Sequence, residues 1–236
     1  MKIAAISILL LFSFGCVNAQ TKEADYIKDL KEQLVIKWPK NKTINIVFHG
    51  HSVPSGYFKG GTVKKLESYP HLFLKFLVEK YPMAVINSIT TSLGGEQSEQ
   101  GAKRFKDEVL TMKPDLLFID YALNDRSIGI ERTEKSWRSM IGEALAANVK
   151  IVLLTPTPDL KEDILDENAP LEKFSEMIRL LGTEYQIPIV DVYKHFKTLK
   201  KSGIDISRFM SQNNHPNELG HQEVLKMMVS TLFEKL

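Results

Sequence analysis

Cysteine is almost absent from this chain of 236 residues, which has a single one, Cys16. The chain also lacks basic and acidic runs: 31 Lys and Arg residues are scattered among 29 Asp and Glu residues, for a formal charge of +2. Balanced, scattered charge argues against nucleic acid or an anionic membrane as the main partner. Low-complexity tracts and internal repeats are missing too. A hydrophobic content of 43% is enough for one globular core.

The N-terminus has the pattern of an export signal. Lys2 gives a positive start, residues 3–14 form an apolar run, and Val17-Asn18-Ala19 places small residues where a signal peptidase cleaves. The run is too short for a transmembrane span. We therefore expect residues 1–19 to be a signal peptide and residues 20–236 to form a single domain that is exported to the periplasm or secreted.

Lipoprotein processing at Cys16 is the alternative, because this cysteine follows Gly15. Against it, Ser13 stands where a lipoprotein signal usually has Leu or a similar residue. We prefer cleavage before Gln20, which leaves a mature chain without cysteine. Neither disulfides nor thiol chemistry can then contribute to the mature protein.

Short apolar runs alternate with helical patterns along the rest of the chain. The runs are apolar throughout, as expected of strands covered by helices on both faces. This alternation predicts a three-layer α/β/α sandwich with a doubly wound parallel sheet, whose functional sites lie at the carboxyl ends of the strands. The predicted strands are 43–48, 83–89, 115–121, 149–154 and 187–192, and the predicted helices are 24–38, 69–81, 98–110, 133–147 (capped by Thr133), 171–185 and one that follows Asn217.

A candidate nucleophile follows the first predicted strand. Ser52 lies in the turn Gly50-His51-Ser52, where a buried strand fixes its position and a glycine permits a tight backbone path. Three more polar or glycine positions have comparable places in the chain. Gly95 follows the second strand, next to Gly94, which we consider less suitable; Asn124 follows the third, and His215 precedes the last helix.

These residues are the parts that acyl transfer needs. A serine hydroxyl becomes an effective nucleophile when a histidine within hydrogen-bond reach takes its proton, which assigns the base to His215. The negative oxygen that develops on the substrate needs hydrogen-bond donors. The Ser52 amide, the Gly95 amide and the Asn124 side chain can supply them. Asp125, beside Asn124, is expected to be a structural hydrogen bonder.

Four segments resemble, in order, the conserved blocks of the SGNH (GDSL-like) hydrolase superfamily. The resemblance spans about 170 residues and implies a flavodoxin-like sheet of five parallel strands, an esterase activity through Ser52 and His215, and no cofactor. Exported relatives commonly remove acetyl groups from carbohydrate. The matching segments are Gly50-His51-Ser52, Gly95-Glu96-Gln97-Ser98, Tyr121-Ala122-Leu123-Asn124-Asp125 and His215-Pro216-Asn217 with Gly220-His221.

The chain departs from the family pattern at the catalytic acid. The family has Asp three residues before the catalytic histidine, whereas this chain has Gln212. Loss of that carboxylate can lower the rate of a serine hydrolase by about 10⁴. Three explanations remain open: a Ser–His dyad oriented by Gln212 or a main-chain carbonyl, an acid from elsewhere such as Asp191 or Asp205, or a non-catalytic relative that binds carbohydrate. His51 and Ala122 are further departures, in place of the family's Asp and Gly.

A metal site is a further alternative, because His49-x-His51 resembles the first-strand motif of amidohydrolases. The chain is short for their eight-stranded barrel and has no other histidine at a strand end. We therefore expect no metal.

The leading hypothesis is an exported serine esterase that removes short acyl groups, most plausibly acetyl, from carbohydrate. Tyr57, Phe58 and Arg126 are candidate substrate contacts because they flank the nucleophile and Asn124. A small-molecule or glycan ester is the expected partner. A lipase-like enzyme or arylesterase of the same family is the alternative within enzymes.

Overall fold

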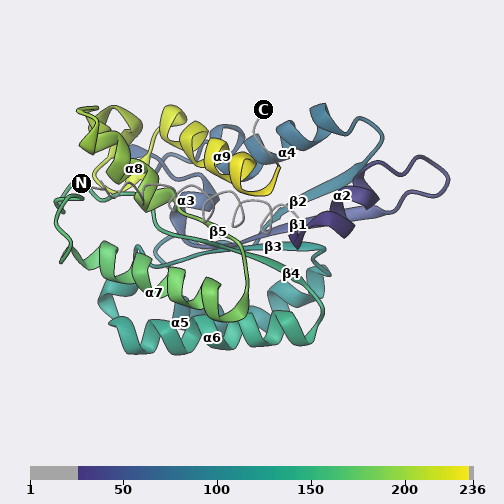
Figure 1. Cartoon of the computed structure of the whole chain (residues 1–236), viewed down its shortest axis with the longest axis horizontal. Helices are drawn as coiled ribbons and strands as arrows, with labels where there is room; N and C mark the ends of the chain where they lie inside the picture. Colours follow the sequence, from purple (N-terminus) through teal and green to yellow (C-terminus); the bar gives the residue numbers. More distant parts are fainter. Residues whose placement is uncertain (1–25, 234–236) are drawn as a thin grey trace, which may run out of the picture.

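The computed structural model describes residues 26–233, in which one parallel sheet lies between two layers of helices (Figure 1). The strands have the order β2-β1-β3-β4-β5, and each neighbouring pair is parallel. The predicted three-layer α/β/α fold with a five-stranded parallel sheet is confirmed. The strands are β1 (Thr43–Gly50), β2 (Val85–Thr90), β3 (Leu116–Asp120), β4 (Lys150–Leu154) and β5 (Ile189–Val190).

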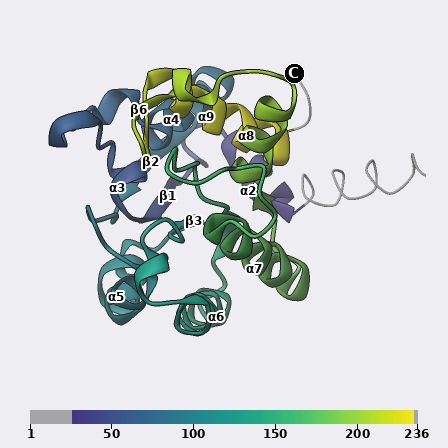
Figure 2. The same cartoon turned by 90° about the vertical axis from the view of Figure 1, so that its left-hand side faces the viewer.

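Helices cover both faces of the sheet (Figure 2), and each face has its own apolar core, as the continuous apolar runs require. Phe48 and Phe118 stack on one face at 4.8 Å between ring centroids, whereas Val47 and Leu117 point into the other core. The first face is covered by α2 (Lys28–Leu34), α4 (Tyr69–Lys80), α8 (Val192–Lys201) and α9 (Glu218–Leu232), and the second by α5 (Ser98–Arg104), α6 (Ile130–Ala146) and α7 (Pro170–Tyr185).

Several predicted boundaries are wrong. Helix α6 begins at Ile130, and Thr133 is not its cap but lies in its first turn, where its hydroxyl donates to the Gly129 carbonyl. Gly129 has φ +81° and can therefore turn the chain into the helix earlier than predicted. The helix predicted over 98–110 is regular only to Arg104 and continues as π and 3₁₀ turns to Met112.

Helix α8 and the hairpin before α9 are among the elements that were not predicted. Helix α8 follows β5 at once, so that the strand predicted over 187–192 is cut to two residues. A small antiparallel hairpin of β6 (Met210–Gln212) and β7 (His215–Pro216) precedes α9. As predicted, Asn217 caps α9: its side chain accepts a hydrogen bond from the Gly220 amide at 3.1 Å.

Among residues 26–233, no helix is long and apolar enough to cross a membrane. The predicted signal peptide, residues 1–19, and the alternative lipidation site, Cys16, lie outside the described residues.

Gly50, at the end of β1, lies too close to Asp120 of β3 to carry a side chain. A Cβ atom at this position would lie 2.1 Å from the carbonyl oxygen of Asp120, an impossible contact with rigid backbone. We predict that Gly50→Ala lowers the free energy of unfolding by about 2 kcal/mol or more, measured by urea denaturation.

Gly142→Ala is the matched control. Gly142 lies inside α6, and no atom is found within 4 Å of the position that its Cβ would take. This substitution should stabilise the protein by up to about 1 kcal/mol. Equal effects of the two variants would contradict the role given to Gly50.

Candidate active site

Strand β1 ends at Gly50 and is followed by His51. Ser52 comes next and is the first residue of a short helix, α3 (Ser52–Ser55). The His51 side chain caps this helix, since its Nδ1 accepts a hydrogen bond from the Val53 amide at 3.2 Å. The chain leaves the helix through Gly56, which has φ +90°. These two residues form the tight turn that holds the Ser52 hydroxyl at the carboxyl edge of the sheet.

His215 contacts this hydroxyl from the other end of the chain. Its Nε2 lies 2.8 Å from Ser52 Oγ, across 163 residues of sequence. His215 belongs to the β6–β7 hairpin and is half-buried. The structure thus places the candidate nucleophile and the candidate base within hydrogen-bonding distance of each other.

Gln212 is the partner of the other His215 ring nitrogen. The two residues are paired across the hairpin, and the side-chain nitrogen of Gln212, Nε2, faces His215 Nδ1. The amide group also lies 3.3 Å from Asn214 Oδ1. An amide has an oxygen and a nitrogen, so it can either accept a hydrogen bond from Nδ1 or donate one to it. The orientation of this amide therefore decides which imidazole nitrogen carries the proton.

The two aspartates considered as replacement acids have other partners. Asp205 accepts hydrogen bonds from the amide and hydroxyl of Ser207. Asp191 is held by Arg179 and by the Thr155 hydroxyl. Neither carboxylate forms a hydrogen bond or ion pair with His215 in the described part of the chain, which leaves Gln212 as the residue that faces Nδ1.

Two causes lower the pKa of His215 below its ordinary value. Burial removes water from the charged imidazolium and is the larger cause; the charge of nearby His51 is the second. No carboxylate offsets these effects, because Gln212 is neutral. His215 is therefore unprotonated at neutral pH, the state that a general base requires.

The candidate oxyanion donors follow the carboxyl ends of β1, β2 and β3, which are neighbours in the sheet. Gly95 has φ +77°, and no atom lies within 4 Å of the position a Cβ would take, so its backbone faces open space. The Asn124 side-chain amide donates one hydrogen bond to the Glu96 carbonyl at 2.9 Å. An amide nitrogen has two hydrogens. The second remains for a substrate oxygen.

Asp125 is a structural hydrogen bonder, as the sequence predicts. Its carboxylate accepts from the amides of Ser98 at 2.6 Å and Ala122 at 3.0 Å, and from the indole of Trp137 at 3.3 Å. These bonds shape the turn that carries Asn124. Ala122 has φ +66° there, which explains why glycine is usual at this position of the family pattern.

Glu96 and Arg104 support this turn, although nothing in the sequence pattern marks them. The Glu96 carboxylate is buried and accepts hydrogen bonds from Arg104 Nε at 2.7 Å and from the Tyr121 hydroxyl at 2.7 Å. The ion pair fixes the backbone of Glu96, whose carbonyl orients Asn124. Only the folded structure brings these residues together, since their spacing follows no motif.

The candidate substrate contacts differ in their surroundings. Tyr57 is half-buried and its ring covers Gly94, where a Cβ would lie 3.0 Å from the ring. Phe58 is buried against the His221 ring, at 5.5 Å between centroids. Arg126 donates to Asp159 at 2.8 Å and to the Leu123 carbonyl at 3.0 Å, and also pairs with Glu162. Its guanidinium thus faces the protein's own carboxylates.

The two histidines of the His-x-His motif do not form the pair that the metal alternative needs. His49 is buried between Thr91, the Gly101 carbonyl and the Tyr121 hydroxyl, and burial lowers its pKa to about 3. His51 lies beyond the strand and its Nε2 is 3.6 Å from Asp120. The two rings have separate surroundings. Within residues 26–233 no group of three or more His, Cys, Asp or Glu side chains could hold a metal ion.

The site has a serine hydrogen-bonded to a histidine at the carboxyl edge of a five-stranded parallel sheet, beside a glycine and an asparagine amide. This is the arrangement of the SGNH class of hydrolases. Residues 48–223 match the sequence profile of the GDSL-like Lipase/Acylhydrolase family, and the chain belongs to this family. The predicted resemblance is confirmed. A comparison with the sequences of curated proteins found no match.

Solved structures with the same fold include several carbohydrate esterases. A two-domain esterase (CEX) active on acetylated mannans is 18% identical with a TM-score of 0.72, covering 87% of this chain and 52% of its own. The chain thus spans about half the length of that protein. The acetyl xylan esterase AlAXEase is 23% identical with a TM-score of 0.67, covering 79% and 98%. Axe2, an acetylxylan esterase from Geobacillus stearothermophilus, is 19% identical with a TM-score of 0.69, covering 81% and 95%.

Arg126 connects the turn of Asn124 with the segment that supports the His215 hairpin. That segment contains Asp159, and the amide of the next residue, Leu160, donates to the Asn213 carbonyl at 2.7 Å. We predict that Arg126→Met lowers kcat for ester hydrolysis about tenfold with little change in KM. Without this link, the oxyanion donor Asn124 and the base His215 shift relative to each other.

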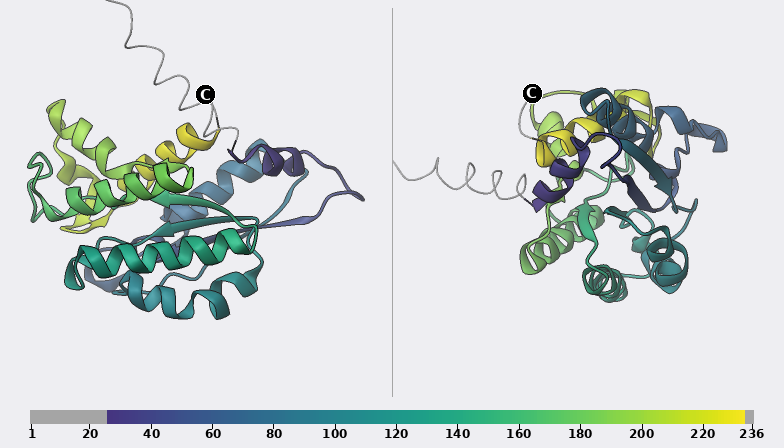
Figure 3. Two further views of the ribbon diagram at one scale, coloured as in Figure 1. Left: turned by 60° about the horizontal axis from the view of Figure 1, so that its bottom comes forward. Right: turned by 90° about the vertical axis from the view of Figure 1, so that its right-hand side faces the viewer.

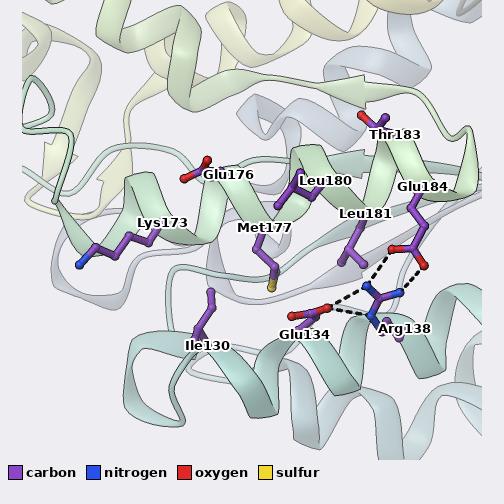
Figure 4. A pocket seen from close by; sticks show the side chains of 10 residues that line it. All are labelled: Ile130, Glu134, Arg138, Lys173, Glu176, Met177, Leu180, Leu181, Thr183 and Glu184. Atoms are coloured by element: carbon purple, nitrogen blue, oxygen red, sulfur yellow. Dashed lines mark hydrogen bonds and ion pairs between the residues drawn. The ribbon is translucent and has the colours of Figure 1, made fainter.

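Arg138→Met is the matched control (Figure 4). Arg138 also binds two carboxylates, Glu134 and Glu184, but joins α6 to α7 in a surface groove away from Ser52. Its loss should leave kcat unchanged. Steady-state kinetics and melting temperatures of both variants test this, and an equal loss of kcat in both would contradict the role of Arg126.

Proposed function

We propose that this protein is an exported serine esterase that removes short acyl groups, most plausibly acetyl, from carbohydrate. The observation that carries the proposal is the 2.8 Å contact between His215 Nε2 and Ser52 Oγ, beside amide donors at one edge of the sheet. Membership of the GDSL-like family supports ester hydrolysis. The acetylated mannan and xylan esterases with this fold support the carbohydrate part.

The reaction proceeds through an acyl-enzyme. His215 takes the Ser52 proton as Oγ attacks the ester carbonyl, and the new C–O bond places negative charge on the carbonyl oxygen. The amides of Ser52 and Gly95 and the side chain of Asn124 bind that oxygen. His215 then gives its proton to the sugar oxygen as the ester C–O bond breaks. Water, deprotonated by His215, attacks the acyl-enzyme, and the bond to Ser52 Oγ breaks as Oγ takes the proton back from His215, which releases the acid.

Gln212 orients the base in this mechanism. His215 Nε2 can accept the serine proton only when the other nitrogen, Nδ1, carries a hydrogen. The Gln212 side-chain oxygen must then accept that hydrogen, which requires the amide to be turned so that its oxygen takes the place of the nitrogen that faces Nδ1 in the structure. An amide fixes the tautomer in this way but stabilises the imidazolium less than a carboxylate does. The enzyme is therefore a Ser–His dyad with a neutral orienting residue.

Gln212 also supports the second candidate function, a non-catalytic relative that binds glycans. The missing carboxylate is what a retired active site would show. An esterase hydrolyses its ester substrate, whereas the non-catalytic relative binds glycan without turnover. The export part of the proposal rests on the sequence pattern of residues 1–19, and a lipid anchor at Cys16 remains its alternative.

We predict that the protein hydrolyses 4-nitrophenyl acetate faster than the octanoate ester, and that Ser52→Ala abolishes this turnover. Initial rates of both proteins on acetate, butyrate and octanoate provide the measurement. Faster hydrolysis of octanoate would instead indicate the lipase-like alternative. Equal, near-background rates for wild type and Ser52→Ala, together with glycan binding, would favour the non-catalytic relative.

We predict that Gln212→Glu, which keeps the size of the side chain, raises kcat at pH 8 by about tenfold. The added carboxylate stabilises the imidazolium and raises the pKa of His215. Activity needs the unprotonated base, so the acid limb of the kcat/KM profile should move to higher pH. In the wild type that limb should lie below the ordinary histidine value of about 6.5.

Gln212→Leu is the control for this experiment, because it removes the orienting group without adding charge. It should lower kcat and leave the acid limb at low pH. Identical rates and profiles for wild type, Gln212→Glu and Gln212→Leu would show that Gln212 does not act on His215.

A further inference from the structure

Three loops meet at the end of the sheet opposite Ser52, where the strands begin. They are residues 35–42, 81–84 and 110–115, and we call the surface that they form the Trp38 face. Hydrogen bonds join them: the Asn41 side chain donates to the Met83 carbonyl at 3.3 Å, and the Lys42 ammonium donates to Asp115 at 2.7 Å. The loop between α2 and β1 protrudes from this end in two views (Figure 1, Figure 3).

Large apolar side chains are exposed on this face. Trp38, in the protruding loop, is 84% exposed, the highest value for a large apolar side chain among residues 26–233. Val35, Met83 and Met112 are between 40% and 61% exposed. A soluble surface seldom gathers such residues without a partner to cover them.

The same loops carry an excess of positive charge. Lys37, Lys40 and Lys113 are exposed and have no acidic partner within the described part of the chain. Asp115, the one carboxylate in these loops, is already paired with Lys42 at 2.7 Å. The chain as a whole is nearly neutral, so this local excess is not visible in its composition.

We propose that the Trp38 face docks on an anionic lipid bilayer. Tryptophan prefers the boundary between headgroups and acyl chains, and lysines next to it are attracted to anionic headgroups. A bound protein would direct Ser52, at the opposite edge of the sheet, away from the lipid. The proposal rests on different observations from the esterase proposal and does not need it.

The described chain enters the fold at this same end. The Tyr26 hydroxyl accepts from the amide of Ile151, and the Lys150 ammonium lies 5.1 Å from the Tyr26 ring centroid, at the start of β4. Cys16 is ten residues before Tyr26 in the sequence. Ten extended residues span at most about 35 Å. An acyl group at Cys16, if present, would therefore be tethered to the end of the fold that bears Trp38.

The polar groups of the Trp38 face fit headgroups better than sugars. Protein sites for sugars need side chains that accept and donate hydrogen bonds to hydroxyls. Here the side-chain amides of Asn41 and Asn45 are used on backbone carbonyls, and the exposed polar groups of Lys37, Lys40 and Lys113 are ammonium donors alone. Negatively charged phosphate groups are the ligands that such donors bind.

Vesicle binding tests the proposal. The chain is produced without residues 1–19, so that no acyl group can be attached at Cys16, and is mixed with vesicles of phosphatidylglycerol and phosphatidylcholine or of phosphatidylcholine alone. The chain has two tryptophans, and Trp137 is fully buried. A blue shift of the emission therefore reports on Trp38. We expect this shift, and co-sedimentation, with the anionic vesicles only.

Single substitutions test which residues contribute to vesicle binding. Trp38→Ala should lower the partition coefficient from co-sedimentation at least tenfold, and each of Lys37→Gln, Lys40→Gln and Lys113→Gln about fivefold. Leu180→Ala and Lys173→Gln are the controls, since they remove an exposed apolar and a basic side chain from the groove between α6 and α7 (Figure 4). They should bind as the parent does.

Four results would overturn the proposal. These are no binding to anionic vesicles, equal binding to neutral vesicles, equal losses in the control variants, and a Trp38-dependent dimer or glycan complex in place of vesicle binding. Because Trp38 and the three lysines are exposed, their substitution is not expected to unfold the protein. Unchanged melting temperatures would verify this.

Discussion

The hydrogen bond between His215 and Ser52 depends on how the last part of the chain is fastened to the first strand. The β6–β7 hairpin that carries His215 is held from several sides. The Leu160 amide donates to the Asn213 carbonyl, and Asn217 donates to the Arg208 carbonyl at 2.8 Å. Gly220 lets α9 approach closely, because a Cβ there would lie 2.2 Å from the Phe209 carbonyl oxygen. The geometry of the Ser52–His215 pair thus depends on contacts along the whole carboxyl edge of the sheet.

The electrostatics of the site follow from the absence of a carboxylate beside His215. Burial and His51 lower the pKa of His215, and Gln212 adds no opposing charge. Such a histidine is unprotonated at neutral pH and can accept a proton, but its charged form receives little stabilisation. His215 is therefore unprotonated over a wide pH range. Proton transfer to it is less favourable than transfer to the histidine of a complete triad, because no carboxylate stabilises the imidazolium.

Much of the fold and the Ser52–His215 pair could be predicted because their signals are local. Apolar runs define the strands, and the residue types around Ser52, Asn124 and His215 follow the family pattern. Helix α8 was missed although Asp191 caps it, because the apolar residue Val192 after the cap is also typical of the end of a strand. The Glu96–Arg104 pair and the Arg126 contacts with Asp159 and Glu162 join residues whose spacing has no motif. Side-chain partners across the sheet edge are set by tertiary packing, which sequence patterns do not report.

The central claim is that Ser52 is a nucleophile activated by His215. A fluorophosphonate reagent tests it most directly, because the phosphorus is attacked by an activated serine and the adduct stays covalent. We predict one adduct by intact-mass spectrometry, located at Ser52 by peptide mapping and formed much more slowly in His215→Ala. A folded wild-type protein that forms no adduct, or forms it at another residue, would contradict the account.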